Sequence, residues 1–235
     1  MIRTITISRV LGAGLGFVFV SAEASAHIGI HGPGFADTNQ IVTLGVGHGC
    51  EGSDTKSVRV EIPPEVLSVR AVDSNLGRAT VELDDAGLVT AVTWQKPESE
   101  VLPADTNYYT LALRLRVPNR PFSTLYFPAY QTCQTADGEI LETAWSSTMP
   151  EDEVPEGEEP APALTILPAR VTGWNQYTVP VDIDDVSAFF ADAQIVWKGE
   201  AAYSSNAATT ELIAATDGVS SLASLSEGDV IWVKY

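Results

Sequence analysis

The chain has 235 residues, and 31 acidic residues against 13 lysines and arginines give it a formal net charge of −18. A surface with this charge repels phosphate backbones, which argues against nucleic-acid binding, and it attracts cations. No stretch is long and apolar enough to span a bilayer as a helix, so we expect a mature protein without a membrane-spanning segment.

The N-terminal segment has the pattern of a secretory signal peptide. Two arginines precede a short apolar run, and Ala24 and Ala26 match the small-residue rule for cleavage. The pattern predicts removal of residues 1–26 and a periplasmic or secreted product. Cleavage after Ala26 would make His27 the first residue of the mature chain.

Apolar and polar residues alternate through the first two-thirds of the mature chain, which predicts a series of short strands. The expected strands are residues 41–46, 57–62, 66–72, 79–83, 89–94, 108–117, 124–132, 140–145 and 164–167. Turn residues at 84–87 and 136–138 predict two hairpins. This spacing, punctuated by Pro and Gly, is typical of an immunoglobulin-like β-sandwich, which we place at residues 27–167.

Two further regions differ from this pattern. Residues 150–162 mix acidic residues with prolines and predict a solvated loop or linker. Residues 168–235 predict a small α+β region without an assignable role. Its expected strands are 174–179, 195–197 and 228–235, and its expected helices are 184–193 and 206–215. We expect its aromatic residues, including Trp197 and Trp232, to pack in a hydrophobic core and not to form a ligand-binding surface.

The chain has two cysteines, Cys50 and Cys133. An even number of cysteines in an exported chain favours a disulfide, and each lies beside an expected strand. Metal ligation by the two cysteines is the alternative, although neither has a cysteine nearby in the sequence.

A mature N-terminal His27 would offer two nitrogen donors from one residue. Its free α-amine and its imidazole Nδ1 can chelate one metal ion in a six-membered ring, and such nitrogen ligands suit Cu(II). The alternative is that a histidine follows the cleavage site by chance.

Four segments form a recognisable combination. They are the mature start His27-Ile28-Gly29-Ile30, residues 47–63 beginning Gly47-His48-Gly49-Cys50, the Val92-Thr93-Trp94 run, and residues 129–145 with Ala129-Tyr130-Gln131-Thr132-Cys133, Asp137-Gly138 and Trp145. Together they resemble the YcnI-like family of exported copper-binding domains. The resemblance covers about residues 27–167 and leaves 168–235 outside it.

The resemblance implies a β-sandwich with a Cu(II) site exposed at one end. In that site the terminal histidine supplies amine and imidazole, and a tryptophan lies beside the metal. On this sequence these positions are His27 and Trp145, and we expect Glu51 as a carboxylate ligand, whereas Trp94 matches a core position. The alternatives are that Trp145 packs against the sandwich edge and that Glu51 is an ordinary loop charge.

The resulting functional hypothesis is an exported protein that captures, buffers or delivers copper(II), with an importer or a cuproenzyme as recipient. One alternative is a copper-dependent oxidative enzyme acting on polysaccharide. Such enzymes use a second histidine from far along the chain, whereas His31 and His48 both lie early, and no catalytic constellation stands out. We therefore expect no enzyme. The other alternative is a metal-free structural or adhesive sandwich.

Overall fold

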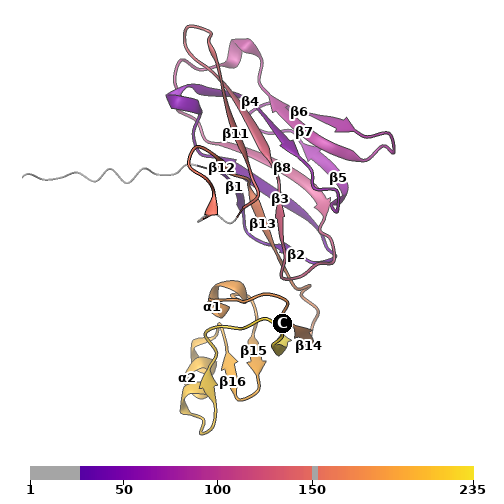
Figure 1. Ribbon diagram of the computed structural model, residues 1–235, viewed down its shortest axis with the longest axis vertical. Helices are drawn as coiled ribbons and strands as arrows, with labels where there is room; N and C mark the ends of the chain where they lie inside the picture. The colour runs from indigo at the N-terminus through magenta and orange to yellow at the C-terminus, as the bar shows by residue number, and fades with distance from the viewer. Residues whose placement is uncertain (1–26, 150–152) are drawn as a thin grey trace, which may run out of the picture.

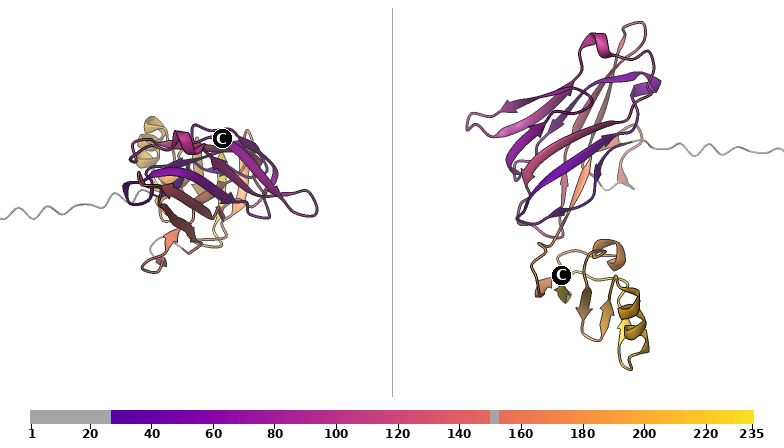
Figure 2. Two further views of the ribbon diagram at one scale, coloured as in Figure 1. Left: turned by 90° about the horizontal axis from the view of Figure 1, so that it is seen from above. Right: turned by 180° about the vertical axis from the view of Figure 1, so that it is seen from behind.

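The computed structural model describes residues 27–149 and 153–235, so the expected signal peptide lies outside the described residues. A β-sandwich and a smaller C-terminal unit lie one below the other (Figure 1), and the views from above and behind agree (Figure 2). Each unit has its own hydrophobic cluster. A mainly β sandwich followed by a small unit with short helices confirms the expected fold class.

Two sheets pack face to face in the sandwich. The first contains, in spatial order, β1 (Ile28–His31), β3 (Asn39–Val46), β8 (Tyr109–Arg116) and β5 (Leu67–Val72). The second contains β12 (Glu159–Pro160), β11 (Ile140–Ser147), β10 (Ala129–Gln134), β4 (Asp54–Glu61), β7 (Val89–Gln95) and β6 (Arg78–Leu83). A third, shorter sheet contains β2 (Gly34–Phe35), β13 (Ala163–Leu167) and β9 (Thr124–Tyr126).

The core of the sandwich lies between the inward faces of these strands. Successive side chains of a strand point to opposite faces, so Leu111 and Leu113 of β8 are buried and Ala112 between them is more exposed. Trp94 of β7 is fully buried, as the family resemblance implies, and its indole N–H donates to the Val72 carbonyl at 2.7 Å. Each fully buried leucine stabilises the fold by roughly 1.5–3 kcal/mol.

The strand expected at 124–132 is wrong as a single element. The chain forms β9 and β10 there, and the two belong to different sheets. Pro128 lies at the break, where its missing N–H cannot join a ladder. The buried Phe127 beside it donates its N–H to the Pro162 carbonyl at 2.8 Å. The break therefore carries the chain from the short sheet into the six-stranded one.

The linker expected at 150–162 is also wrong in its last part. Residues 150–152 lie outside the described residues, and residues 155–158 are exposed, as a solvated loop requires. Glu159–Pro160, however, form β12 and pair in parallel with β11, and the buried Ala161 donates its N–H to the Ser147 carbonyl at 2.7 Å. The segment therefore returns to the sandwich, and β13 follows it into the core.

A disulfide joins Cys50 to Cys133, with the Cα atoms 5.7 Å apart, which confirms the expected bridge. It ties the 3₁₀ turn Cys50–Gly52 to β10. Because both sulfurs are used in the bridge, metal ligation by the two cysteines is excluded in this structure.

A charged triad that the sequence pattern does not predict lies buried inside the sandwich. The Lys96 ammonium lies 2.5 Å from one carboxylate oxygen of Asp54 and donates to the Tyr109 hydroxyl at 2.6 Å. That hydroxyl in turn donates to the other Asp54 oxygen at 2.6 Å. Burial, followed by the bond to Asp54, raises the pKa of Tyr109, so its hydroxyl keeps the proton that it donates.

The C-terminal unit contains one sheet and two helices. In spatial order its strands are β14 (Trp174–Thr178), β18 (Val230–Lys234), β15 (Ile195–Lys198), β16 (Ala201–Tyr203) and β17 (Ser220–Ser221). The helices are α1 (Val186–Phe189) and α2 (Ala207–Ala215). Asn206 caps α2, as expected, whereas α1 is shorter than expected. No helix in the described part of the chain is long and apolar enough to cross a bilayer.

One residue of the sandwich belongs to the core of the C-terminal unit. Phe122, between β8 and β9, is buried and stacks on Phe189 with ring centroids 5.5 Å apart. It also packs edge-on against Tyr177 and Phe190. Its N–H donates to the Ile166 carbonyl at 2.7 Å, although its backbone φ of 70° is unfavourable for a residue with a side chain. Phe122 therefore joins the two units.

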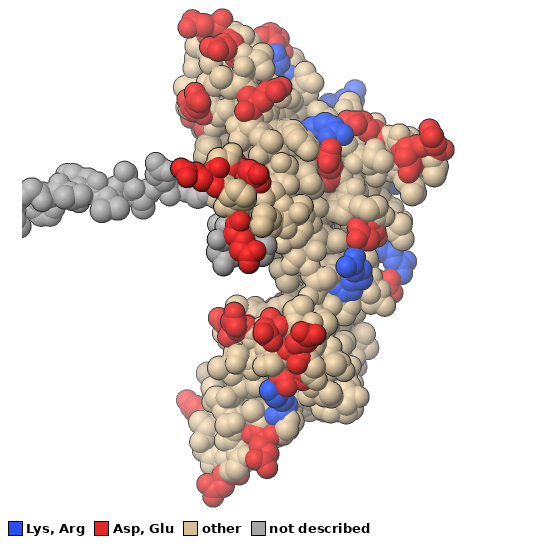
Figure 3. Space-filling view, in the orientation of Figure 1, with Lys and Arg blue, Asp and Glu red and all other residues tan. Residues whose placement is uncertain are grey.

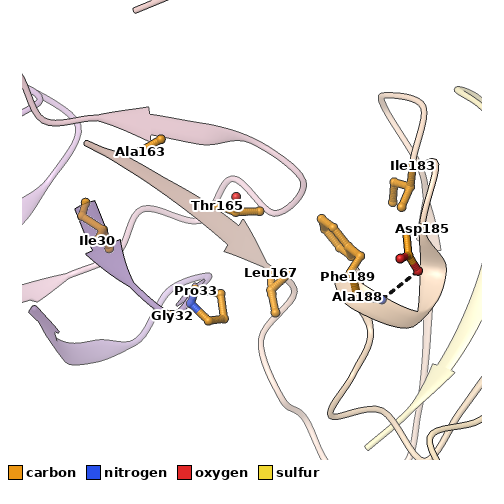
Figure 4. A pocket seen from close by; sticks show the side chains of 10 residues that line it. All are labelled: Ile30, Gly32, Pro33, Ala163, Thr165, Leu167, Ile183, Asp185, Ala188 and Phe189. Carbon is orange, nitrogen blue, oxygen red and sulfur yellow. Dashed lines mark hydrogen bonds between the residues drawn. The ribbon is translucent and has the colours of Figure 1, made fainter. Parts of the chain in front are cut away.

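A pocket of about 430 Å³ lies where the two units meet. Figure 4 shows Phe189 of α1 pointing across it toward Thr165 and Leu167 of β13. On its far side, Asp185 accepts the Ala188 N–H at 3.0 Å and so begins α1.

Candidate metal centre

His27 is held at the start of an edge strand. The next residue, Ile28, is buried and pairs with Val46 of β3, which fixes the direction of the backbone at His27. The His27 side chain itself is 23 % exposed. A donor at this place is held by the sheet behind it and remains open to solvent.

Trp145 of β11 lies beside two imidazoles. Its ring centroid is 5.4 Å from that of His27 and 6.5 Å from that of His48. The Trp145 side chain is buried, so its indole forms a wall of the site and also part of the sandwich core. The structure therefore brings together His27 and Trp145, the two residues that the resemblance paired.

A buried glutamine holds Trp145 and the His48 loop in place. The Trp145 indole N–H donates to Oε1 of Gln131 at 3.1 Å. Gln131 Nε2 donates to the His48 carbonyl and to the Thr55 hydroxyl, both at 2.8 Å. Gln131 is 1 % exposed, and this network satisfies its amide on both sides. The indole is thus fixed by hydrogen bonds as well as by packing.

The carboxylate near His27 belongs to Glu159. The Oε2 atom of Glu159 lies 4.0 Å from Nε2 of His27. Glu159 reaches this position because β12 pairs it with Trp145, which lies beside His27. Glu159 is not among the site residues expected from the sequence. A strand of two residues carries no alternation, and only the pairing with β11 reveals its position.

Glu51 lies in the 3₁₀ turn Cys50–Gly52, next to the disulfide. Glu51 is exposed in the 3₁₀ turn, with a φ of 51°, and makes no ion pair or side-chain hydrogen bond in the described part of the chain. Its role as a ligand stays a prediction.

The two remaining histidines have their own partners. Nδ1 of His48 lies 2.5 Å from the Gly49 carbonyl, an arrangement in which Nδ1 carries the proton. His31, at the other end of β1, lies 2.6 Å from the Tyr108 hydroxyl through Nε2. Gly45 leaves the room for this pair, because a Cβ there would lie 1.8 Å from the Tyr108 oxygen. Of the two, His48 is the one that lies beside Trp145.

An open hollow of about 480 Å³ adjoins the site. Its walls include His27, Tyr126, Met149 and Pro160. Figure 3 shows acidic side chains spread over both units in this view, with few basic ones among them. A cation therefore meets an attractive potential on approach and an accessible site.

Side chains alone do not complete a metal site here. Within residues 27–149 and 153–235, no group of three or more His, Cys, Asp or Glu side chains is arranged to hold a metal ion. Chelation at His27 therefore requires the α-amine, which exists only when His27 is the first residue of the chain.

A family model described as a domain of unknown function (DUF1775) matches residues 34–166, more than half of the chain. The chain belongs to the DUF1775 family. The DUF1775 match includes Trp145, Gln131 and Glu159, but it begins after His27 and ends before the C-terminal unit. The family description itself names no function.

Two solved structures are similar to this DUF1775 protein. An uncharacterized protein from Nocardia farcinica, described as having an immunoglobulin-like fold, is 29% identical; the match covers 61% of this chain and 99% of that chain, with a TM-score of 0.47. A D312A variant of BcpA, the major pilin subunit of Bacillus cereus, is 12% identical, covering 86% of this chain and 52% of that chain, with a TM-score of 0.34. No curated protein is significantly similar.

Proposed function

We propose that this protein binds one copper(II) ion outside the cytoplasm through His27, and that it captures, buffers or delivers the ion. The observation that carries the proposal is the position of His27, with its imidazole 5.4 Å from the Trp145 ring and 4.0 Å from the Glu159 carboxylate. The disulfide is consistent with the oxidising compartment that export requires.

The donors at this position fit copper(II). After cleavage before His27, the α-amine and Nδ1 supply two nitrogens, and a carboxylate or water completes the shell. Nitrogen and oxygen donors of this kind suit Cu(II), whereas soft thiolates would favour Cu(I). Because both cysteines are bridged, they supply no thiolate here.

Glu159 suits the role of a positioning residue. It lies on the Nε2 side of the His27 ring, and chelation with the amine uses Nδ1. A carboxylate that accepts the Nε2 proton fixes the tautomer in which the Nδ1 lone pair is available, and it raises the basicity of the ring. At 4.0 Å, one bridging water or a small side-chain movement completes this contact.

The openness of the site favours transfer of the ion over permanent storage. His27 lies at a strand end beside an open hollow, and a recipient can reach the ion there. We propose a copper importer or a cuproenzyme as the recipient, and binding without catalysis as the activity.

A titration of the mature protein with Cu(II), followed by electron paramagnetic resonance, tests the proposal. The expected result is one site with nitrogen ligation. His27→Ala should weaken binding at least about tenfold, which corresponds to ~1.4 kcal/mol. His31→Ala is the matched control, because its imidazole bonds to Tyr108 at the other end of β1. Equal binding by both variants would contradict the proposal.

A further inference from the structure

The outer face of the C-terminal sheet is rich in exposed tryptophan. Side chains on one face of β18 and β15, such as Ile231 and Val196, fill the core. The other face carries Trp232, which is 43% exposed, and the half-buried Trp197, so the expected core position of both residues is wrong. Trp174 on the edge strand β14 is 53% exposed.

The register of the sheet places polar groups between the indoles. One row across the strands is Gln176, Trp232 and Trp197, and the next is Trp174, Lys234 and Ile195. Side chains directly opposite one another have Cβ atoms about 4.5–5.5 Å apart. An amide and an ammonium group therefore lie within reach of anything that rests on the indole faces.

Four of these six side chains form a hollow of about 530 Å³. They are Trp174, Ile195, Trp197 and Trp232. Among the described residues, no aromatic ring stacks on these three tryptophans, and Lys234 has no ion pair. The faces of the indoles and the charge of Lys234 are thus available to a ligand.

We propose that this face binds a neutral polysaccharide, whose pyranose rings rest on the indoles. A pyranose ring has an apolar face and a rim of hydroxyls, and the surface pairs indoles with hydrogen-bonding groups from Gln176 and Lys234. The formal charge of −18 disfavours an anionic glycan, and a single lysine on this face is too little for an anionic membrane.

The size of the surface also favours a glycan over a protein. A stable protein interface takes about 20–30 residues a side, whereas this surface consists of the four residues that line the hollow together with Gln176 and Lys234. The site lies outside residues 34–166 of the family match and uses none of the residues around His27, so the proposal is independent of copper.

Retention of the mature protein on polysaccharide tests the proposal. The probes are insoluble chitin and cellulose, with soluble xylan and mixed-linkage glucan in affinity gels, all in buffer with EDTA. We expect retention by at least one of them. Trp232→Ala and Trp174→Ala should each weaken it about tenfold, and Trp232→Tyr should restore part of it. Leu212→Ala, at a 66% exposed apolar residue of α2 outside the hollow, should leave it unchanged.

Circular dichroism first establishes that each variant is folded; Trp174, on an edge strand, is the safer of the two positions. Failure of all four polysaccharides to retain the wild-type protein would overturn the proposal. Equal retention of folded Trp232→Ala or Trp174→Ala would do so as well. A concentration-dependent dimer that Trp232→Ala abolishes in sedimentation would assign the face to a second copy instead.

Discussion

Glu159 lies opposite Trp145 in the parallel ladder between β12 and β11, and this pairing brings a carboxylate to within 4.0 Å of the His27 imidazole. β12 therefore does more than connect β11 to β13. It returns the chain to the edge of the sandwich beside His27, so three separate parts of the sequence meet at one site.

Glu159→Gln should weaken Cu(II) binding by about 10- to 100-fold, because an amide orients the His27 ring less well and does not raise its basicity. Competition titration against a chelator of known affinity measures the change. Glu158→Gln is the matched control, since it removes the same charge from the exposed neighbouring residue. An equal loss of Cu(II) affinity in both variants would mean that Glu159 acts only through its negative charge and not through its contact with His27.

Copper affinity should fall as the pH is lowered from 8 to 6. A free α-amine has a pKa of about 8, so below that value protons compete with the metal for this donor. The logarithm of the apparent affinity should fall by about one for each pH unit on this account. Affinity that is constant over this range would show that the amine is not a ligand.

Asp54→Asn should destabilise the sandwich by about 3–5 kcal/mol, because it leaves the buried Lys96 ammonium without its counter-charge. Urea unfolding measures this loss. Asp37→Asn breaks an ion pair with Arg116 that is about half exposed, and it should cost about 1 kcal/mol or less. Equal losses would contradict the structural importance of the buried triad.

Phe122→Ala should destabilise the C-terminal unit by about 3–5 kcal/mol, because its ring fills the core beside Phe189. We expect calorimetry to show an earlier transition for this unit and a smaller change for the sandwich. Ile41→Ala, at a 62% exposed position of β3, is the control and should change little. An unchanged first transition in Phe122→Ala would show that the two units are not joined through this residue.

The sandwich was predictable because its strands are half-buried. Alternation marks a strand with one face in the core, and β4, β7 and β8 follow this pattern over most of their length. The disulfide was predictable because the chain has an even number of cysteines and its N-terminal pattern predicts export. His27 followed from the cleavage pattern and from the two nitrogen donors of a terminal histidine, whereas Trp145 came from the family resemblance.

Other features depend on tertiary pairing that no local pattern reveals. Glu159 lies in a strand of two residues, and Phe122 packs with residues far along the chain. The alternation of residues around Trp232 predicts a strand with one buried and one exposed face. It does not predict which of the two faces packs against the rest of the chain. Pro128, in contrast, is a local signal that should have divided the strand predicted at 124–132.

Chelation by the terminal histidine is tested by comparing the mature protein with a form that carries one extra alanine ahead of His27. Mass spectrometry first verifies both N-termini. The added residue leaves the imidazole, Trp145 and Glu159 in place and moves only the free amine. Competition titration should show Cu(II) binding weaker by at least about tenfold in the extended form. Equal affinity in the two forms would contradict chelation by the terminal histidine.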